Sequence, residues 1–330
     1  MKKIYLNDHF MTDFLLSDIK LIDPSFSLVK VSEVINKTSL PFIIQLLKFR
    51  VLPFLYLLLF LFYRFFYKYI YGATMQDDKV LYFAVENMYE LSRLLFVNRR
   101  VKYHALWIWN PVSSLGKNKY DRYIYMYLFI VFLKFLGVEL WTFDENDAEQ
   151  YGFSYHSQIH NAERLINFSK HSFSKSKFLF VGQDKGRLDN LLKIQNILNN
   201  FHVESFFYVT KDVDKEYVES GLVSMQTKPL PYDAYLAEIV KCSGLIDIVQ
   251  NGQKGMTLRV LEALFLKKKL ITNNPSIKEY DFYNSNNIYL LNEGFDDESF
   301  ADFLAADFVS ANPDLLYRYD VLHLLHAIFK

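Results

Sequence analysis

The chain has 330 residues, a length that suits two domains of about 150 residues each. Lysine and arginine together number 37, as do aspartate and glutamate, so no overall positive charge predicts a nucleic-acid partner. The one cysteine, Cys242, excludes an intramolecular disulfide and is expected to be a core residue rather than a nucleophile.

The first half of the chain alternates apolar runs of strand length with runs of helical length. A helix is expected over Tyr120–Leu136, where a continuous apolar face ends at Gly137. Strands are expected at Lys3–Leu6, Ser27–Val31, Lys79–Val85, Val101–Trp109 and Val138–Phe143. Strands separated by helical runs predict a parallel α/β sheet.

Much of the aromatic content lies in residues 42–71. The uncharged run Val51–Tyr63 is only about two-thirds as long as a spanning helix requires, and it contains Pro53. Basic residues and tyrosines flank this run, which suits a segment lying in the lipid headgroup layer. A buried helix of the first domain explains the same residues equally well, and the two interpretations are compatible. The first residues become polar too early for a signal peptide, so we expect a cytoplasmic location.

The second half of the chain restarts the pattern after a stretch rich in serine and lysine. A buried strand opens at Phe178, and later runs predict helices at Leu188–Leu198 and Tyr232–Lys241 around a strand at Glu204–Val209. We therefore expect two domains, residues 1–171 and 172–330. The last segment, Pro313–Lys330, has helical spacing and is a candidate to cross back onto the first domain.

The most informative pattern lies in Cys242–Pro275. This segment reads as a short apolar strand, a loop with glycines, a helix that contains Glu262, and a second apolar strand. Backbone N–H groups at a helix N-terminus form a ready site for a diphosphate. Glu262 follows the loop by about two helical turns, where a carboxylate can accept hydrogen bonds from ribose hydroxyls. The alternative is that Gly255 only turns the chain and that Glu262 is a solvated helix residue.

Residues 253–264, followed by 269–274, resemble the donor-site signature of GT-B glycosyltransferases, in particular those of bacterial surface polysaccharide and lipopolysaccharide synthesis. The resemblance implies a GT-B fold of two Rossmann-like domains with an interdomain cleft, the first for the acceptor and the second for the donor. It also implies that Arg259 neutralises the diphosphate and that Glu262 holds the ribose. The loop residues that would line the donor are Gln253, Gly255, Met256 and Thr257. Lys254 departs from the family pattern, which has a glutamate there.

Two further segments of the second half are candidates for the donor side. The turn from Gly182 to Arg187 follows the first strand of that half, where Lys185 and Arg187 can neutralise a departing nucleoside diphosphate without a metal. A solvated basic turn is the alternative. Tyr232 can stack on a base or serve only the helix that it begins. Asp212-Val213-Asp214 resembles a metal-binding Asp-x-Asp motif but is interpreted as a solvated turn, so no metal site is predicted.

The acceptor side offers weaker candidates, all of which follow predicted strands of the first half. A general base must reach the acceptor hydroxyl, and Asp8, His9 and Asp144 are candidates for it. Trp109 and Asn110 end another strand and are candidates to line the acceptor site. Asp147, near Asp144, is a further candidate, with a helix N-cap as its alternative role.

The predicted function is transfer of a sugar from a UDP-, GDP- or CMP-type donor to a glycan or lipid-linked acceptor, without a cofactor, on the inner face of the cytoplasmic membrane. Two alternatives remain open. One is a non-catalytic, membrane-attached assembly protein of a polysaccharide locus. The other is a transferase of another activated group, such as glycerol phosphate, on the same fold.

Overall fold

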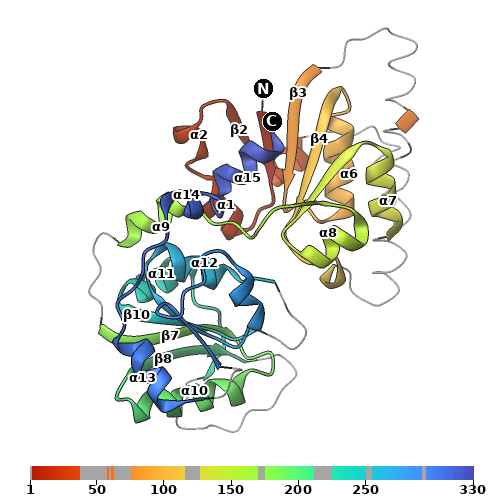
Figure 1. The fold of residues 1–330 in the computed structure, drawn as a ribbon. Coiled ribbons are helices and arrows are strands. Elements are labelled where there is room, and N and C mark those ends of the chain that lie inside the picture. Colours follow the sequence, from red (N-terminus) through yellow and green to blue (C-terminus); the bar gives the residue numbers. More distant parts are fainter. Residues whose placement is uncertain are drawn as a thin grey trace. The chain divides into compact units, whose positions relative to one another are not determined.

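The chain divides into two compact units in a computed structural model (Figure 1). The first unit comprises Met1–Ser157 with Val321–Lys330, and the second comprises Gln158–Asp320. The division therefore falls before the boundary at 171 and 172 that the sequence suggested. The structure describes residues 2–37, 58, 61–62, 76–115, 127–169, 175–211, 225–249, 255–291 and 295–330.

The first unit is built on a six-stranded parallel sheet with the order β2-β1-β3-β4-β5-β6. Its strands are β1 (Lys2–Leu6), β2 (Phe26–Lys30), β3 (Gln76–Phe83), β4 (Val101–Ile108), β5 (Val138–Thr142) and β6 (Ser154–Tyr155). Its helices are α1 (Phe10–Leu16), α2 (Ile19–Ile22), α3 (Val31–Lys37), α6 (Met88–Val97), the 3-10 helix η1 (Val112–Ser114), α7 (Tyr127–Phe135), α8 (Glu145–Tyr151) and α15 (Val321–Ile328).

The second unit is built on another six-stranded parallel sheet, with the order β12-β11-β10-β7-β8-β9. Its strands are β7 (Lys175–Gln183), β8 (Glu204–Thr210), β9 (Met225–Gln226), β10 (Cys242–Asp247), β11 (Lys269–Thr272) and β12 (Ile288–Leu290). Its helices are α9 (Ala162–Ser169), α10 (Leu188–Asn200), α11 (Tyr232–Val240), α12 (Leu258–Phe265), the 3-10 helix η3 (Pro275–Glu279), α13 (Asp297–Ala305) and α14 (Pro313–Tyr317).

Both sheets have the strand order of doubly wound α/β proteins. In the second unit the chain winds outward through β7, β8 and β9 and then returns to the other side of β7 with β10, which is the Rossmann order. Helices α10 and α13 lie on one face of this sheet and α11 and α12 on the other (Figure 1). The structure confirms the predicted fold class, two Rossmann-like α/β units, and is consistent with a GT-B type fold.

Apolar runs of the sequence form the central strands because both faces of each sheet are covered by helices. The first core contains Val80 and Tyr82 of β3 and packs against α6 and α7. The second contains Phe178 and Phe180 of β7 and packs against α10 and α13. Cys242 begins β10, and burial raises the pKa of its thiol to about 11, as expected of a core cysteine.

Some elements differ from those expected. The segment expected as one helix over Pro313–Lys330 forms two, α14 and α15, which are separated by Arg318–Asp320. Of the expected helix at 120–136, the structure describes only the part from Tyr127 onward. Most of residues 42–71 also lie outside the described residues, with Leu58, Leu61 and Phe62 the exceptions. Within the described ranges, no helix has the length and apolar character needed to cross a bilayer.

The C-terminal helix α15 completes the first unit. Its residues Val321, Leu324, Leu325 and Ile328 are buried, and Tyr103 of β4 donates a hydrogen bond of 2.8 Å to the carbonyl of Ile328. His323 of this helix lies 2.8 Å from His156 (Nδ1 to Nε2), and the other ring nitrogen of His156 lies 2.8 Å from the carbonyl of Ser157. Burial lowers the pKa of His156 to about 4, and the neighbouring His323 acts in the same direction.

This histidine pair predicts a loss of stability in mild acid. An unfolded His156 binds its proton near pH 6.5, whereas the folded one does so only near pH 4, so the unfolded state gains protons first as the pH falls. The contribution of His156 to the free energy of unfolding is complete above pH 6.5 and should decrease by about 2 kcal/mol between pH 7 and pH 5. Urea unfolding of the wild type and of His156→Gln at several pH values measures this slope, which should be shallower in the variant. Equal slopes would contradict the assignment.

A second prediction concerns the close packing of β10 on β7. A Cβ atom added at Gly244 would overlap the ring of Phe178, which is buried in the second core. Gly244→Ala should therefore lower the free energy of unfolding by about 1–3 kcal/mol. The matched control is Gly182→Ala on β7, where the added Cβ would meet its nearest neighbour at an ordinary 3.4 Å. Urea unfolding of both variants checks the difference, and equal destabilisation would contradict the packing argument.

Candidate functional site

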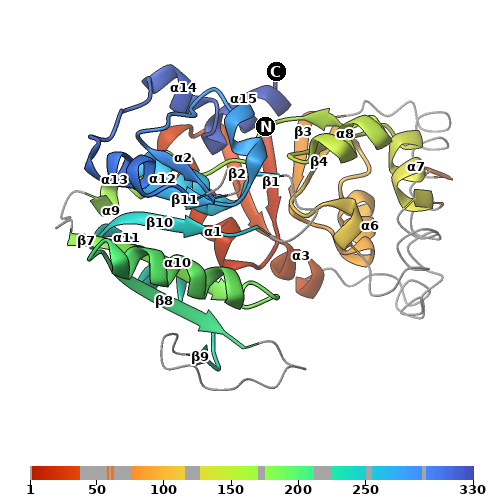
Figure 2. The same ribbon diagram turned by 60° about the horizontal axis from the view of Figure 1, so that its bottom comes forward.

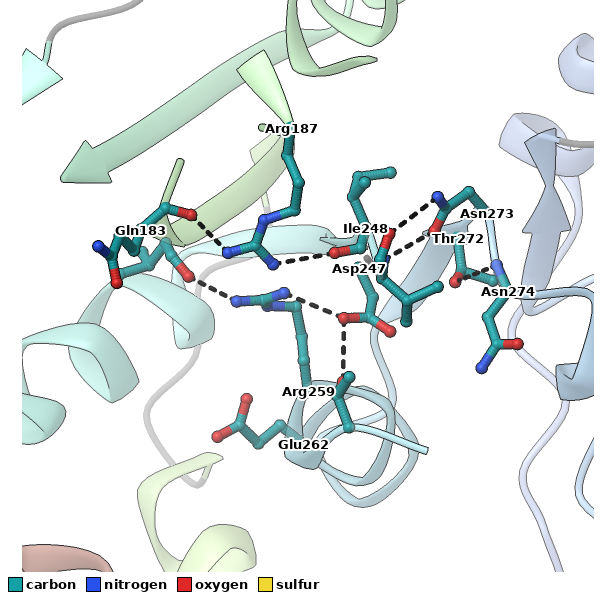
Figure 3. Close-up of polar contacts among 12 residues, drawn as sticks. Gln183, Arg187, Asp247, Ile248, Arg259, Glu262, Thr272, Asn273 and Asn274 are labelled. Carbon is teal, nitrogen blue, oxygen red and sulfur yellow. Dashed lines mark hydrogen bonds and ion pairs between the residues drawn. The ribbon is translucent and has the colours of Figure 1, made fainter. Parts of the chain in front are cut away.

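The candidate site lies at the carboxyl edge of the second sheet, between β7 and β10. The chain reverses its winding direction between these neighbouring strands, and ligands of open α/β sheets bind in the crevice at such a point. Strand β7 ends at Gln183 and β10 ends at Asp247. Two arginines, Arg187 and Arg259, bridge the two strand ends (Figure 3).

Arg259 is paired with Asp247. Its Nη1 lies 3.1 Å from Oδ1 of Asp247, and its Nη2 donates to the carbonyl of Val181 on β7. The Asp247 side chain is 1% exposed, and burial raises the pKa of its carboxyl group although Arg259 and Thr257 act in the opposite direction. This ion pair fixes the first turn of α12 to the ends of both β7 and β10.

Arg187 makes a second bridge across the same strand ends. Its guanidinium donates to the carbonyls of Gln183, Asp184 and Ile248, and the bond to Ile248 is 2.9 Å long. The guanidinium carbons of Arg187 and Arg259 lie 5.3 and 4.9 Å from the ring centroid of Phe180. Two cationic groups therefore share one aromatic ring as well as one edge of the sheet.

The turn between β7 and α10 presents a lysine to solvent. Oδ1 of Asp184 accepts hydrogen bonds from the backbone N–H groups of Arg187 and Leu188, at 3.0 and 2.9 Å, and so holds the turn that leads into α10. Lys185 and Gly186 both have positive φ, 45° and 76°, and Lys185 is exposed. Gly182 lies within β7, where a Cβ atom would come within 3.5 Å of Nη2 of Arg187. The structure thus brings Gly182, Lys185 and Arg187 together at this edge.

The N-terminus of α12 lies at the same edge. Thr257 is its N-cap residue, in extended conformation, but its hydroxyl donates to Oδ1 of Asp247 at 2.9 Å and does not cap the helix. Gly255 and Met256 precede it, and Met256 is buried. Gln253 lies outside the described residues, as do Lys254 and the motif Asp212–Asp214. No side-chain cap to α12 is found among the described residues. Uncapped N–H groups at the start of a helix can bind an anion.

Glu262 is engaged by the protein itself. Its side chain is 3% exposed, and its two oxygens accept hydrogen bonds from the hydroxyls of Tyr232, at 2.7 Å, and Tyr235, at 2.5 Å. Nε2 of His160 lies 3.8 Å from Oε1. Burial alone would raise the pKa of Glu262, but His160 and the two hydroxyls lower it below its ordinary value. Glu262 is therefore neither solvated nor open, and Tyr232 points its hydroxyl at this carboxylate and at His160.

Asp247 is the residue of this edge that the sequence analysis did not single out. Oδ1 has two partners, but Oδ2 is buried and has no hydrogen-bond partner among the described residues. Figure 3 shows this second oxygen pointing away from Arg259. The signal available in the sequence was a carboxylate that ends an otherwise apolar strand directly before the glycine loop.

Two asparagines extend the same edge at the end of β11. The side chain of Asn273 pairs with the backbone of Val249, its Oδ1 accepting at 2.8 Å and its Nδ2 donating at 3.2 Å. Asn274 is buried and caps η3 by accepting from the N–H of Ser276. Both side chains hold the backbone after β10 and β11 in place (Figure 3).

The acceptor-side candidates all lie at the carboxyl edge of the first sheet. Asp8 accepts two hydrogen bonds from Ser32, from the backbone N–H at 3.1 Å and the hydroxyl at 2.8 Å. His9 caps α1, its Nδ1 accepting from the N–H of Met11, so in the neutral ring Nε2 carries the proton. Asp144 caps α8 by accepting from the N–H of Asp147 at 3.0 Å. The N-cap of this helix is thus Asp144, so the alternative role of Asp147 as the cap does not hold.

Glu86 organises the end of β4, and the sequence analysis missed it. Its Oε1 accepts from the N–H groups of Trp109 and Asn110, at 2.6 and 2.7 Å, and its Oε2 accepts from the Asn110 side chain at 2.7 Å. Burial raises the pKa of Glu86 despite these bonds. Glu90, on the first turn of α6, also has a raised pKa, caused by burial and by the charge of Asp8. No sequence motif distinguishes either glutamate.

Comparison with protein-family models and with curated proteins found no match to this chain. Across the described ranges, no group of three or more histidine, cysteine, aspartate or glutamate side chains is arranged to hold a metal ion.

The contacts of Glu262 predict that it contributes strongly to stability. Glu262→Ala would remove the carboxylate that accepts from the buried hydroxyls of Tyr232 and Tyr235, and should lower the free energy of unfolding by about 2–4 kcal/mol. The matched control is Glu279, which is exposed. Glu279→Ala should change the free energy of unfolding by less than about 0.5 kcal/mol. Urea unfolding measures both. An unchanged stability in Glu262→Ala would show that this carboxylate is free to serve a ligand.

Proposed function

We propose that this protein is a GT-B type glycosyltransferase. It transfers a sugar from a nucleotide-sugar donor of the UDP, GDP or CMP type to a glycan or lipid-linked acceptor in cell-surface polysaccharide synthesis. Two Rossmann-like units with parallel sheets support the proposal at the level of the fold. The function itself is inferred from the edge of the second sheet.

One observation carries the proposal, the N-terminus of α12 beside the switch point of a Rossmann-ordered sheet. The side chain that would ordinarily cap this helix, Thr257, is bound to Asp247 instead. The backbone N–H groups of Leu258 and Arg259 can then bind the diphosphate of a nucleotide, assisted by the helix dipole. The loop with Gly255 leads directly into this position.

The cationic side chains at this edge suit the departure of a nucleoside diphosphate. Arg187 and Arg259 are held by backbone carbonyls and by Asp247, so their positive charges are fixed before a ligand arrives. Lys185 is exposed on a turn beside them and can move toward a phosphate. Such preorganised charge stabilises developing negative charge on a leaving group without a metal ion. This is the chemistry that a metal-independent hexosyl transfer requires.

The contacts of Glu262 change the part that we assign to it. Because Tyr232 and Tyr235 already occupy its oxygens, Glu262 acts on the donor through α12 and Arg259 unless these hydroxyls move. For the acceptor side, Asp8, His9 and Asp144 remain candidates for the base, with Trp109 and Asn110 beside them at the strand ends. A peripheral location on the cytoplasmic face of the inner membrane belongs to the same proposal.

Removing a single backbone N–H group tests the proposed diphosphate site. Leu258 is the first residue of α12, a position where proline fits, and Thr257 before it already has the extended conformation that proline requires (φ −86°, ψ 161°). Leu258→Pro should therefore fold but lose one charge-assisted hydrogen bond, and should weaken nucleoside diphosphate binding about tenfold. Leu258→Ala removes the same side chain while keeping the N–H group, and is the matched control.

Isothermal titration with UDP and GDP measures these affinities, after a thermal-shift screen of the wild type has chosen the nucleotide. Equal affinities in Leu258→Pro and Leu258→Ala would show that the N–H group of Leu258 does not bind the nucleotide, and would contradict a diphosphate site at the start of α12. No binding of any nucleotide by a folded wild type would instead favour the non-catalytic alternative.

A further inference from the structure

The carboxylate of Asp247 is buried, but only one of its oxygens has hydrogen-bond partners. Oδ1 accepts from the hydroxyl of Thr257 at 2.9 Å and from Nη1 of Arg259 at 3.1 Å. Oδ2 is also buried and has no partner among the described residues. Buried polar atoms are usually hydrogen-bonded, and one that is not leaves its desolvation uncompensated. The charged form of Asp247 is therefore poorly stabilised for a group at the centre of the sheet edge.

The two oxygens of Asp247 are placed so that a proton can be added without breaking a bond. A protonated carboxyl group keeps an oxygen that accepts and gains one O–H donor. With a proton on Oδ2, Oδ1 can keep its bonds to Thr257 and Arg259. Figure 3 shows Oδ2 turned away from Arg259. The first turn of α12 can thus stay attached to β10 in either protonation state.

The groups packed around Asp247 decide how readily it takes up that proton. Helix α12 packs on β10 and β11 (Figure 2) and contributes Arg259, while the turn before α10 contributes Arg187. Strand β11 contributes Thr272, the partner of Asp247 in the sheet register, and β7 contributes the backbone carbonyl of Val181, which is bonded to Arg259. Burial raises the pKa of the Asp247 carboxyl group although the two arginines act in the opposite direction.

A diphosphate at the start of α12 would change this balance of charge. It would lie beside Arg259, whose own backbone N–H group belongs to the first turn of the helix. Glu262, the other carboxylate that acts on Arg259, is already bonded to Tyr232 and Tyr235. Additional negative charge opposes the ionisation of a nearby carboxyl group. The pair of Asp247 and Arg259 is neutral when Asp247 is ionised and positive when Asp247 is protonated, so an anion favours the protonated form.

We propose that Asp247 is a positioning residue that takes up a proton when a nucleoside diphosphate binds. The proton comes from solvent and goes to Oδ2. Arg259 keeps its place, and its charge is no longer cancelled by its partner but acts on the phosphates. This inference rests on the proposed function, because it requires a diphosphate at the start of α12. It adds to that function a proton-linked control of the donor site, in which binding tightens as Asp247 is neutralised.

Comparison of the wild type with Asp247→Asn tests the proposal. Asparagine keeps an oxygen that can accept from Thr257 and Arg259 but is never charged, so it resembles the protonated form. Because protonation is no longer needed, Asp247→Asn should bind UDP or GDP about tenfold more tightly near neutral pH. A residue that only anchored Arg259 would give weaker binding in the variant. The matched control is Asp302→Asn at an exposed position of α13, which should bind as the wild type does.

Calorimetric titration in two buffers of different ionisation enthalpy counts the protons taken up on binding. At one or more values between about pH 5.5 and pH 7.5, the wild type should take up at least about half a proton more than Asp247→Asn. The pH dependence of the two affinities should differ by the same amount. A terminal phosphate group itself titrates near about pH 6, but it contributes to both proteins and cancels in the comparison.

A second measurement uses the wild type alone and does not depend on how the variant folds. Infrared difference spectra of the nucleotide-bound and free protein should show the C=O band of a protonated carboxylic acid, shifted in D2O. Equal proton uptake in the two proteins, weaker binding by a folded Asp247→Asn, or absence of this band would each overturn the inference while nucleotide binding stands. Failure of the folded wild type to bind UDP or GDP would overturn the proposed function, and this inference with it.

Discussion

The buried ion pair between Arg259 and Asp247 is the interaction on which the second unit's candidate site depends. A carboxylate that ends a central strand must be neutralised because it is removed from water, and Arg259 provides the charge from the first turn of α12. The same guanidinium also bonds the backbone of β7, so one residue joins a helix and two strands. The position of the helix N-terminus relative to the sheet edge follows from this requirement.

Polar contacts continue from that ion pair through the interior of the unit. Glu262 on α12 accepts from Tyr232 and Tyr235 on α11, and Tyr232 also contacts His160, which precedes α9. The side chains at the strand ends are therefore held by a second layer of hydrogen bonds that reaches three helices. This arrangement limits the rotamers of Arg259 before any ligand binds, which reduces the ordering that binding requires.

The parts of this structure that the sequence predicted are those with a strong local signal. Apolar runs such as that of β7 gave the strands, and their alternation with helices gave two parallel sheets. The turn at Lys185 and the start of α12 lie at the same edge of the sheet, as expected of segments that follow parallel strands. The roles of Asp247, Glu86 and Glu262 were not predictable in the same way. Each depends on partners distant in sequence, and a helical glutamate among apolar residues does not reveal whether tyrosines or a ribose will face it.

The last ten residues of the chain belong to the first unit, although the second unit lies between them and the rest of it. The contacts that complete the first unit therefore join segments far apart in the sequence, whereas Gln158–Asp320 forms its unit from one continuous segment. Part of the apolar surface of the first unit is covered only by α15, which supplies Leu324, Leu325 and Ile328. Loss of α15 would therefore uncover apolar surface in the first unit rather than in the second.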